Sequence, residues 1–387
     1  MTSQFDLGNV RLLGATEVSY TRRSQRSTSE LLALAFRQAL EEAGLRASDI
    51  DGLGVASFTH GPDRAIDLAW KLGLQPRWIM DDSNGGASGL NILQHAIRAV
   101  QAGDARAIAI VAGDHFEPED FRRLVENYNQ TTRDHLRPLG AGSPNQVFAM
   151  LTAAQMRALG LERADYGALV MRQRQWAALN PQAVYRSPMS LDDYLNAPDV
   201  SWPLGRLDCV PVVDGANALI VTRQDHPAAQ GRPAITVRAL RSLHNIDDQQ
   251  GDGLSTGLAR LAPDLWPQSG LSPADMDVVS IYDDYPVMVL AQLQDLGFFQ
   301  AQDAKRFIHE DIAAGRLALN TSGGQLSAGQ AGAACSLHGL VEVMRQLGGQ
   351  AGERQVPQAR FGLVTGYGMV EYRYGMCSTA LILESLS

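Results

Sequence analysis

The chain has 387 residues and a net charge of -9 at pH 7, with 45% hydrophobic and 19% charged residues. This length predicts two core regions, and the composition is typical of a globular protein rather than a disordered one. The acidic balance leaves no basic stripe, so we expect no nucleic-acid partner, and no apolar run approaches the roughly 18 residues of a membrane span.

The N-terminus and the cysteines predict a cytoplasmic protein. The opening residues, "MTSQFDLGNV", lack the basic and apolar regions of a secretory signal. Cys209, Cys335 and Cys377 do not have the spacing of metal ligands, and three cysteines cannot all pair. We therefore expect reduced thiols and no metal site.

The first predicted helix covers residues 30–43, "ELLALAFRQALEEA", where apolar residues recur at helical spacing. It is followed by "GLRASDIDGL", which begins at Gly44. A glycine after a helix favours the left-handed conformation that ends it, and Ser48 or Asp49 is expected to cap a short turn before a strand.

A loop of small residues, "SNGGASGL", covers residues 83–90 and runs into a predicted helix over 91–103 and a buried strand over 107–113. Such a turn usually presents a reactive side chain or an anion at a helix N-terminus. Its central residue here is Gly86. We expect free space beside Gly86 that admits a bulky or branched carbon of a substrate, with the first helix amides holding an oxyanion.

Residues 117–200 fit the alternation of strands and helices poorly and are interpreted as an insertion, of the kind that forms a lid or a subunit contact. The strand "ANALIVTR" closes the first half, the polar segment 224–233 follows, and "AITVRAL" opens the second half. These boundaries predict an N-terminal half over 1–228 and a C-terminal half over 229–387.

The second half repeats the pattern of the first. "GLSPADMDVV" from Gly270 matches "GLRASDIDGL" as Gly-Leu-x-x-x-Asp-apolar-Asp-x-apolar. "GQAGAA" leads into "CSLHGLVEVMRQLGG" and the strand "FGLVTGYG", just as "GGASGL" leads into a helix and "AIAIVAG". Two matches in the same order favour duplication of one α/β unit.

"GASGLNILQHAIRAVQAGDARAIAIVAGD" resembles the nucleophile segment of the thiolase superfamily, in the branch of sterol-carrier-protein thiolases and lipid-transfer-protein, thiolase-like aldolases. "LDCVPVVDGANALIV", "SIYDDYPVMVLAQLQDLGF" and "NTSGGQLSAGQAGAA" resemble further blocks of that branch, in the right order between about residues 9 and 385. The resemblance implies an α/β thiolase fold of two βαβαβαββ halves in five αβαβα layers, usually dimeric.

The family's catalytic side chains are replaced. Gly86 stands at the nucleophilic cysteine, Gln330 and Tyr282 stand at the two histidines, and the loop of the later cysteine contains Tyr367 and no thiol. Thiolysis of a 3-ketoacyl thioester needs an acyl acceptor on the enzyme, which glycine cannot provide. A retro-aldol cleavage of a 3-hydroxyacyl thioester needs only a proton acceptor and donors for the enolate.

The resemblance to the aldolases assigns roles to four residues. Tyr282 stands where one of their tyrosines does and is the expected proton acceptor, while the second tyrosine position holds Gln330. Asn320 resembles the asparagine that holds an enolate-stabilising water, with turn formation as the alternative. Gln330 donates to a thioester oxygen or fills the histidine's volume. Tyr367 is expected to face the same pocket.

Five further residues have both a functional and a structural interpretation. Ser88 is a substitute nucleophile without a histidine partner, and Asp283 orients Tyr282 or caps the next helix. His338 and His115 are secondary candidates for the site. Arg373, in "EYRYG", meets a CoA phosphate or belongs to a subunit contact.

The sequence thus predicts non-covalent carbon–carbon bond cleavage or formation on an acyl-CoA, of the retro-aldol type on a 3-hydroxyacyl-CoA. Coenzyme A enters as part of the substrate, no bound cofactor is expected, and the protein is expected to be a homodimer. One alternative is a non-catalytic thiolase-like subunit that partners a small zinc-ribbon/OB-fold (DUF35-type) protein. Another is an acyltransferase with a non-standard nucleophile.

Overall fold

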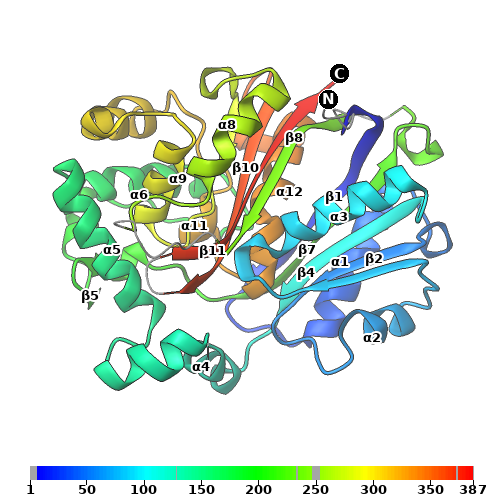
Figure 1. Ribbon diagram of the computed structural model, residues 1–387, viewed down its shortest axis with the longest axis horizontal. Helices are drawn as coiled ribbons and strands as arrows, with labels where there is room; N and C mark the ends of the chain where they lie inside the picture. The colour runs from blue at the N-terminus through cyan, green and yellow to red at the C-terminus, as the bar shows by residue number, and fades with distance from the viewer. Residues whose placement is uncertain (1–6, 128, 232–233, 246–252, 372–373, 387) are drawn as a thin grey trace.

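A computed structural model describes residues 7–127, 129–231, 234–245, 253–371 and 374–386. Within these residues, nine strands form one mixed sheet in the order β3-β2-β4-β7-β1-β8-β11-β10-β9 (Figure 1). The strands are β1 (Val10–Thr21), β2 (Gly52–Ala56), β3 (Trp78–Asp82), β4 (Ala107–Asp114), β7 (Asp214–Arg223), β8 (Ile235–His244), β9 (Val278–Ser280), β10 (Phe361–Glu371) and β11 (Tyr374–Ser385). A separate two-stranded sheet joins β5 (Asp199–Ser201) and β6 (Leu204–Gly205).

The long sheet has the same pairing pattern when read outward from its centre in either direction. In one direction, β1 pairs with β7 and β7 with β4, both antiparallel, and then β4 pairs with β2 and β2 with β3, both parallel. In the other direction, β8 pairs with β11 and β11 with β10, both antiparallel, and β10 pairs with β9, which is parallel. Leu319 then forms a parallel bridge with Val279 of β9. The predicted α/β fold with two similar halves is confirmed.

The sequence repeat has the same structural role in both halves. Gly44 ends α1 (Thr28–Ala43) with φ 64°, and Gly270 ends α8 (Leu258–Ser269) with φ 71°, a region that disfavours residues with a Cβ. In the turn that follows, Asp49 and Asp275 each accept the amide three residues before them. The predicted cap by Asp49 is therefore present.

The second aspartate of each repeat joins two strands. Asp51 accepts the amide of Ala107 at 3.0 Å, where β4 begins. Asp277 accepts the amide of Phe361 at 2.8 Å, where β10 begins. Each carboxylate satisfies backbone donors at the start of the neighbouring parallel strand, which fixes the register at that end of the sheet.

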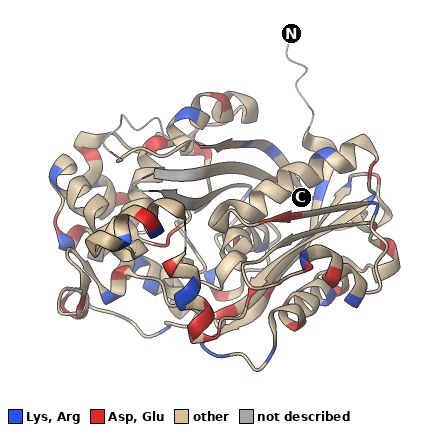
Figure 2. Cartoon of the chain, turned by 60° about the horizontal axis from the view of Figure 1, so that its bottom comes forward, with Lys and Arg blue, Asp and Glu red and all other residues tan. Residues whose placement is uncertain are grey.

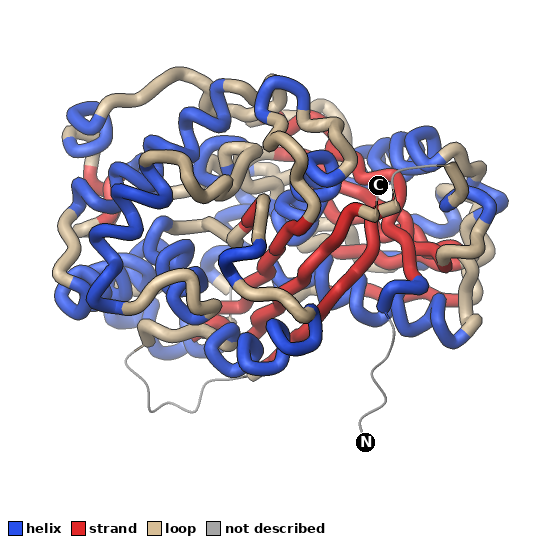
Figure 3. Tube along the Cα trace, turned by 90° about the horizontal axis from the view of Figure 1, so that it is seen from above, coloured by secondary structure: helices blue, strands red, loops and turns tan. Residues whose placement is uncertain are grey.

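Helices cover the strands in layers. α3 (Ser88–Ala102) and α12 (Cys335–Leu347) contact strands of both halves and form the central layer. α1 and α2 (Arg64–Lys71) cover the outer face of the first half, and α8 that of the second. Seen from above, the strands run between helices on both sides (Figure 3). Every residue of β4 is buried because both of its faces are covered.

The predicted insertion is helical. It comprises α4 (Pro118–Glu126), α5 (Pro144–Leu159), α6 (Arg163–Ala178) and α7 (Leu191–Leu195), at the left and lower left of Figure 1. α5 and α6 pack against α9 (Pro286–Asp295), while α6 also contacts α11 (Gly324–Ala328) and the π-helical turn 308–313 that follows α10 (Ala304–Phe307). α5 and α6 therefore belong to the core of the second half, whereas α4 buries none of its side chains.

Charged residues of both signs are interspersed along the outer helices, and neither sign forms a continuous face in the view of Figure 2. Among the described residues, no helix is both long and apolar enough to cross a bilayer.

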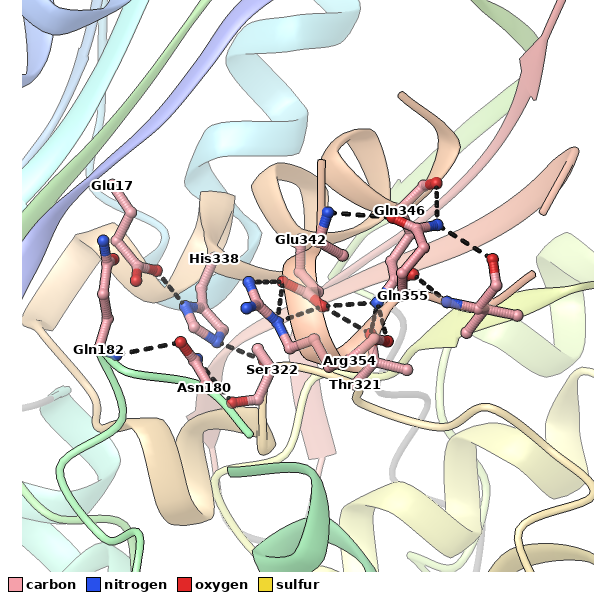
Figure 4. Close-up of polar contacts among 12 residues, drawn as sticks. Glu17, Asn180, Gln182, Thr321, Ser322, His338, Glu342, Gln346, Arg354 and Gln355 are labelled. Atoms are coloured by element: carbon pink, nitrogen blue, oxygen red, sulfur yellow. Dashed lines mark hydrogen bonds and ion pairs between the residues drawn. The ribbon is translucent and has the colours of Figure 1, made fainter. Parts of the chain in front are cut away.

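A buried ion pair joins α12 to the loop that follows it (Figure 4). Arg354 donates to Glu342 through Nε at 3.0 Å and Nη2 at 2.8 Å. Thr321 and Gln346 donate to the same carboxylate. Burial alone would raise the pKa of Glu342, but the hydrogen bonds and charge of Arg354 outweigh it and lower the pKa. Both members of the pair are buried, and Glu342 accepts hydrogen bonds from three side chains.

We predict that Arg354→Met lowers the free energy of unfolding by about 3–5 kcal/mol, because it leaves Glu342 charged, buried and without its cation. The double variant Glu342→Gln/Arg354→Met should recover most of this loss, since no charge then remains. Urea unfolding of both variants measures the difference. Equal losses in the two variants would contradict the assignment.

Candidate active site

A cavity of about 300 Å³ opens where loops from the two halves meet. Its floor includes Gly86, in the single 3-10 turn Gly85–Ala87 before α3, and Tyr282, which follows β9. Gln330 and Cys335 form the side next to α12. Segments far apart in the sequence thus meet at the position where the loops predicted a site.

The ring of Tyr282 lies against the Cα of Gly86. A Cβ on Gly86 would overlap Cε2 and Cζ of that ring and the carbonyl oxygen of Tyr367. The expected free space beside Gly86 is therefore absent, because the tyrosine ring fills it. A cysteine side chain and this ring cannot occupy the same place.

Three hydrogen bonds hold the Tyr282 loop. The amide of Tyr282 donates to Thr365 Oγ1 at 2.9 Å, and its carbonyl accepts from Gln292 Nε2 at 2.8 Å. One residue earlier, the amide of Ile281 donates to Asn320 Oδ1 at 2.8 Å. Buried backbone groups that are paired in this way keep the ring in one position.

Asn320 holds this loop from behind rather than from the cavity. It has a positive φ of 48° and is buried, and it is absent from the cavity lining. Its Nδ2 has no hydrogen-bond partner among the described residues. The turn-forming role is present, and the catalytic role stays a prediction.

Gln330 lies beside Tyr282 in the cavity wall. Its Nε2 donates to Tyr282 Oη at 3.3 Å and to Gln325 Oε1 at 3.2 Å. An amide that donates to the phenol oxygen leaves the phenol proton for another acceptor and favours negative charge on that oxygen. The structure therefore brings together Tyr282, Gln330 and Gly86.

Tyr367 and Ser88 are buried next to this group but are absent from the cavity lining. The Tyr367 ring lies behind Tyr282, with 6.4 Å between the ring centroids. Ser88 is fully buried at the first residue of α3, and its Oγ has no hydrogen-bond partner among the described residues. Both roles stay predictions.

Asp283 points away from the cavity. Its carboxylate accepts the amides of Gln325 at 2.8 Å and Leu326 at 3.3 Å and the side chain of Gln173 at 2.9 Å. Burial raises the pKa of Asp283 to about 7, although these hydrogen bonds oppose the shift. It caps α11 rather than the helix that follows it in sequence.

Asp284 lines the cavity, and the sequence interpretation missed it. Its Oδ1 is buried without a hydrogen-bond partner in the described part of the chain. Burial, followed by the charge of Asp283, raises the pKa of Asp284 to about 8, although hydrogen bonds from the backbone amides of Asp284 and Tyr285 oppose the shift. A usable signal was present, because successive side chains of an extended segment alternate, which puts Tyr282 and Asp284 on one side and Asp283 on the other.

Cys335 also lines the cavity, with its Sγ 3.6 Å from Tyr282 Oη. Burial, together with the charges of Asp284, Asp114 and Asp283, raises the pKa of the thiol to about 12, although the hydrogen bond with Tyr282 opposes the shift. A helix N-terminus ordinarily lowers a thiol pKa, but here desolvation is the larger effect. Near neutral pH this residue is a thiol rather than a thiolate.

His115 anchors the segment that leads into α4. Its Nδ1 lies 3.0 Å from Asp214 Oδ2, and Asp214 also accepts the amide of Phe116. Burial alone would lower the pKa of His115, but the bonds and charges of Asp214 and Glu117 raise it. His115 does not line the cavity, whereas the neighbouring Phe116 does.

His338 lies one turn into α12, in a buried chain of polar groups (Figure 4). Its Nδ1 lies 2.8 Å from Glu17 Oε2, and its Nε2 lies 2.8 Å from Ser322 Oγ. Burial alone would lower the pKa of His338, but Glu17 raises it. Ser322, His338 and Glu17 follow the atom order of a hydrolase triad, yet all three are buried and none lines the cavity.

The roles expected of Arg373 and the question of a metal site remain to be considered. Arg373 lies outside the described residues. In the described part of the chain, no cluster of three or more His, Cys, Asp or Glu side chains is arranged to hold a metal ion.

Residues 241–384 match the family described as thiolase C-terminal domain-like. The chain is also 31% identical over 362 residues to the 17-hydroxy-3-oxo-4-pregnene-20-carboxyl-CoA lyase of Mycobacterium tuberculosis, covering 88% of this chain and 92% of that protein. This chain belongs to the thiolase superfamily.

Within the superfamily, the chain is similar to members of the branch of sterol-carrier-protein thiolases and aldolases. A steroid side-chain-cleaving aldolase of Thermomonospora curvata is 29% identical over 332 residues, covering 81% of this chain and 84% of that protein. The solved structure described as Ltp2-ChsH2(DUF35) aldolase superposes with a TM-score of 0.83 at 27% identity, over 98% of each chain. The branch assigned from the sequence motifs is confirmed.

We predict that Gly86→Ala in this thiolase-superfamily protein lowers the free energy of unfolding by about 1–3 kcal/mol, because the added Cβ overlaps the Tyr282 ring. Adding Tyr282→Ala should remove the part of this penalty that comes from the ring and leave the part that comes from the carbonyl oxygen of Tyr367, whereas adding Tyr282→Phe, which keeps the ring, should remove neither. A double-variant cycle in urea measures the coupling. Additive effects in both cycles would contradict the contact.

Proposed function

We propose that this protein cleaves the carbon–carbon bond of a 3-hydroxyacyl-CoA by a retro-aldol reaction, or forms that bond in reverse. The main support is the Tyr282 ring, which occupies the position at Gly86 that a nucleophilic side chain would need. Among the described residues, no histidine lines the cavity, and burial raises the pKa of its two thiols, Cys209 and Cys335, to about 12, so both are protonated near neutral pH. An acyl-enzyme step therefore has no activated nucleophile.

The reaction uses groups that the cavity presents. Tyr282 accepts the proton of the substrate hydroxyl, the Cα–Cβ bond breaks, and a ketone or aldehyde leaves. The bonding electrons remain on the thioester as an enolate, which the amides near Gly86 stabilise, while Gln330 donates to Tyr282 Oη and favours negative charge on it. Asn320 fixes the loop that carries Tyr282, through its hydrogen bond to Ile281.

The apolar cavity walls favour a bulky hydrocarbon on the acyl group. Aromatic side chains come from the loop after β2, from α4 and the segment before it, and from α5. They are Phe58, Phe116, Phe121 and Phe148. Burying apolar surface is the main source of affinity in such a pocket. Since two relatives are named for steroid-derived substrates, we propose a polycyclic or branched acyl-CoA as the substrate.

The assembly and location are also proposals. We propose a homodimer that works with a small DUF35-type zinc-ribbon/OB-fold protein, supported by the description of the solved relative as an Ltp2-ChsH2(DUF35) aldolase. We propose a cytoplasmic location, where thiols stay reduced. The proposal is supported by Cys209, Cys335 and Cys377, none of which forms a disulfide in the described structure. The halves 1–228 and 229–387 are proposed as the two structural units, and their boundary falls between β7 and β8.

We predict that Tyr282→Phe lowers kcat/KM for cleavage of a 3-hydroxyacyl-CoA by roughly 10²–10⁴-fold, because the ring stays in place while the proton-transfer group is lost. The measurement follows ketone release from a panel of steroidal, aromatic and short-chain 3-hydroxyacyl-CoA thioesters. Tyr166→Phe is the matched control, since Tyr166 is a buried tyrosine bonded to Gln155 Oε1 and is absent from the cavity lining.

An unchanged rate for Tyr282→Phe would contradict the role of this residue. The acyltransferase alternative has its own observation, the presence of Cys209 and Cys335 in the cavity. Incubation with a labelled acyl-CoA followed by mass spectrometry of peptides should leave both cysteines without an acyl group, because neither thiol is ionised near neutral pH. Acylation of either cysteine would replace the retro-aldol proposal with acyl transfer.

We predict that co-expression with a DUF35-type protein gives a stable complex that migrates as one species in size-exclusion chromatography with light scattering. The expected mass is that of two copies of each chain. If the isolated protein binds no acyl-CoA and cleaves none even within the complex, the non-catalytic subunit becomes the better explanation.

A further inference from the structure

The proposed retro-aldol step leaves one proton without a final acceptor. Tyr282 is neutral at the start of the reaction, since a phenol has a pKa near 10 in water. It can accept the substrate's hydroxyl proton only if it gives its own proton to another group. The enolate carbon must also receive a proton before the product leaves as an acyl-CoA, and the same group can supply it.

The cavity offers one carboxylate for this task. Among its described lining residues, Asp284 is the only acidic side chain, and no lysine, arginine or histidine is present. Its Oδ1 has no hydrogen-bond partner in the described part of the chain. An unpaired carboxylate oxygen in a desolvated position costs free energy, and such a cost is commonly kept at functional sites.

The neighbouring aspartate shows what a structural carboxylate looks like in the same loop. Asp283 accepts hydrogen bonds from Gln325, Leu326 and Gln173, and its carboxylate thereby caps the N-terminus of α11. Asp284 follows directly, yet it lines the cavity together with Tyr282. Burial raises the pKa of both carboxyl groups, so the difference between them lies in their contacts: Asp283 is bonded to α11 and Gln173, whereas Asp284 faces the cavity.

We propose that Asp284 takes up the hydroxyl proton through Tyr282 and returns it to the enolate carbon, which makes it the catalytic acid–base group of this cavity. This inference rests on the proposed retro-aldol function. The substrate O–H bond and the Cα–Cβ bond break, and the ketone C=O bond forms. A Cα–H bond then forms with the proton from Asp284. No oxidation or reduction takes place, and both catalytic residues return to their starting states.

The surroundings of Asp284 suit this cycle. The titratable groups that face it are Asp283 and Tyr285 on its own loop, Tyr282, Cys335 at the start of α12, and Cys209 after the 3-10 turn 206–208. Burial and the charge of Asp283 raise the pKa of Asp284 to about 8, so the carboxyl can both lose and regain a proton near neutral pH.

The test uses the protein, with any partner that co-purifies, and 17-hydroxy-3-oxo-4-pregnene-20-carboxyl-CoA as the probe. Cleavage should yield the 17-ketone and propanoyl-CoA, and in ²H₂O the propanoyl-CoA should carry one deuterium at Cα. Asp284→Asn should lower kcat/KM by roughly 10²–10⁴-fold and should slow the enzyme-catalysed exchange of the α-protons of added propanoyl-CoA to a similar extent.

The neighbouring carboxylate supplies a matched variant with a different readout. Wild-type kcat/KM should rise with pH to a plateau above about 8, the pKa of Asp284, because Asp284 must be deprotonated to accept the proton. Asp283→Asn leaves the burial that raises this pKa unchanged and removes the second cause, the charge of Asp283. The pH at half-maximal kcat/KM should therefore move to a lower value in Asp283→Asn, a shift that a merely structural role of Asp284 would not produce.

A stability measurement checks that Asp284→Asn folds. Burial raises the pKa of Asp284 from 3.8 to about 8, so the folded protein holds a proton that the unfolded chain releases within this range. Its contribution to stability is therefore lost as the pH rises through that window. The Tm of Asp284→Asn relative to wild type should increase between about pH 5 and about pH 9.

The outcomes separate the two proposals. If wild type cleaves the probe and Asp284→Asn keeps its rate and its α-proton exchange, Asp284 is not the acid–base group, while the retro-aldol function stands. If wild type cleaves neither this probe nor the wider panel, the proposed function fails and this inference fails with it.

Discussion

The packing of the Tyr282 ring onto the bare Cα of Gly86 determines what this member of the thiolase superfamily can do. Glycine is required there, because any Cβ would overlap the ring and the carbonyl oxygen of Tyr367. The loop that in a thiolase presents a sulfur nucleophile here supports a phenol. Loss of the thiol and gain of the hydroxyl are thus one steric change rather than two independent substitutions.

The rest of the molecule keeps this contact in place. The loop after β9 is tied to Thr365, Gln292 and Asn320, which come from three other segments. The sheet that carries these segments is fixed at its ends by Asp51 and Asp277, the repeated aspartates of the two halves. Long-range hydrogen bonds to buried backbone groups explain why a loop can hold a ring against a single carbon atom.

The fold was largely predictable, since glycine–aspartate repeats and alternating apolar patterns are local signals. The site was predictable only in part. Tyr282 and Gln330 lie side by side as expected. The space beside Gly86 is filled by the Tyr282 ring from the other half, and a contact between residues so far apart in the chain has no local sequence pattern that predicts it. His115 and His338 have carboxylate partners far away in the chain, Asp214 and Glu17, so isolated motifs could not show that both are structurally engaged. Asp284 was missed because two adjacent aspartates suggest capping before they suggest chemistry.

The cavity wall formed by α4 has a consequence for substrate selection. This helix buries none of its own side chains, although Phe121, Leu124 and Val125 line the cavity. A bound hydrocarbon would therefore pack against these apolar side chains of α4 and bury them, as the protein interior does for other helices. We expect discrimination under this helix to be graded by size, at about 0.8 kcal/mol for each methylene of contact, rather than decided by any single polar group. A pocket of this kind tolerates a family of related skeletons and rejects short chains simply because they leave the helix uncovered.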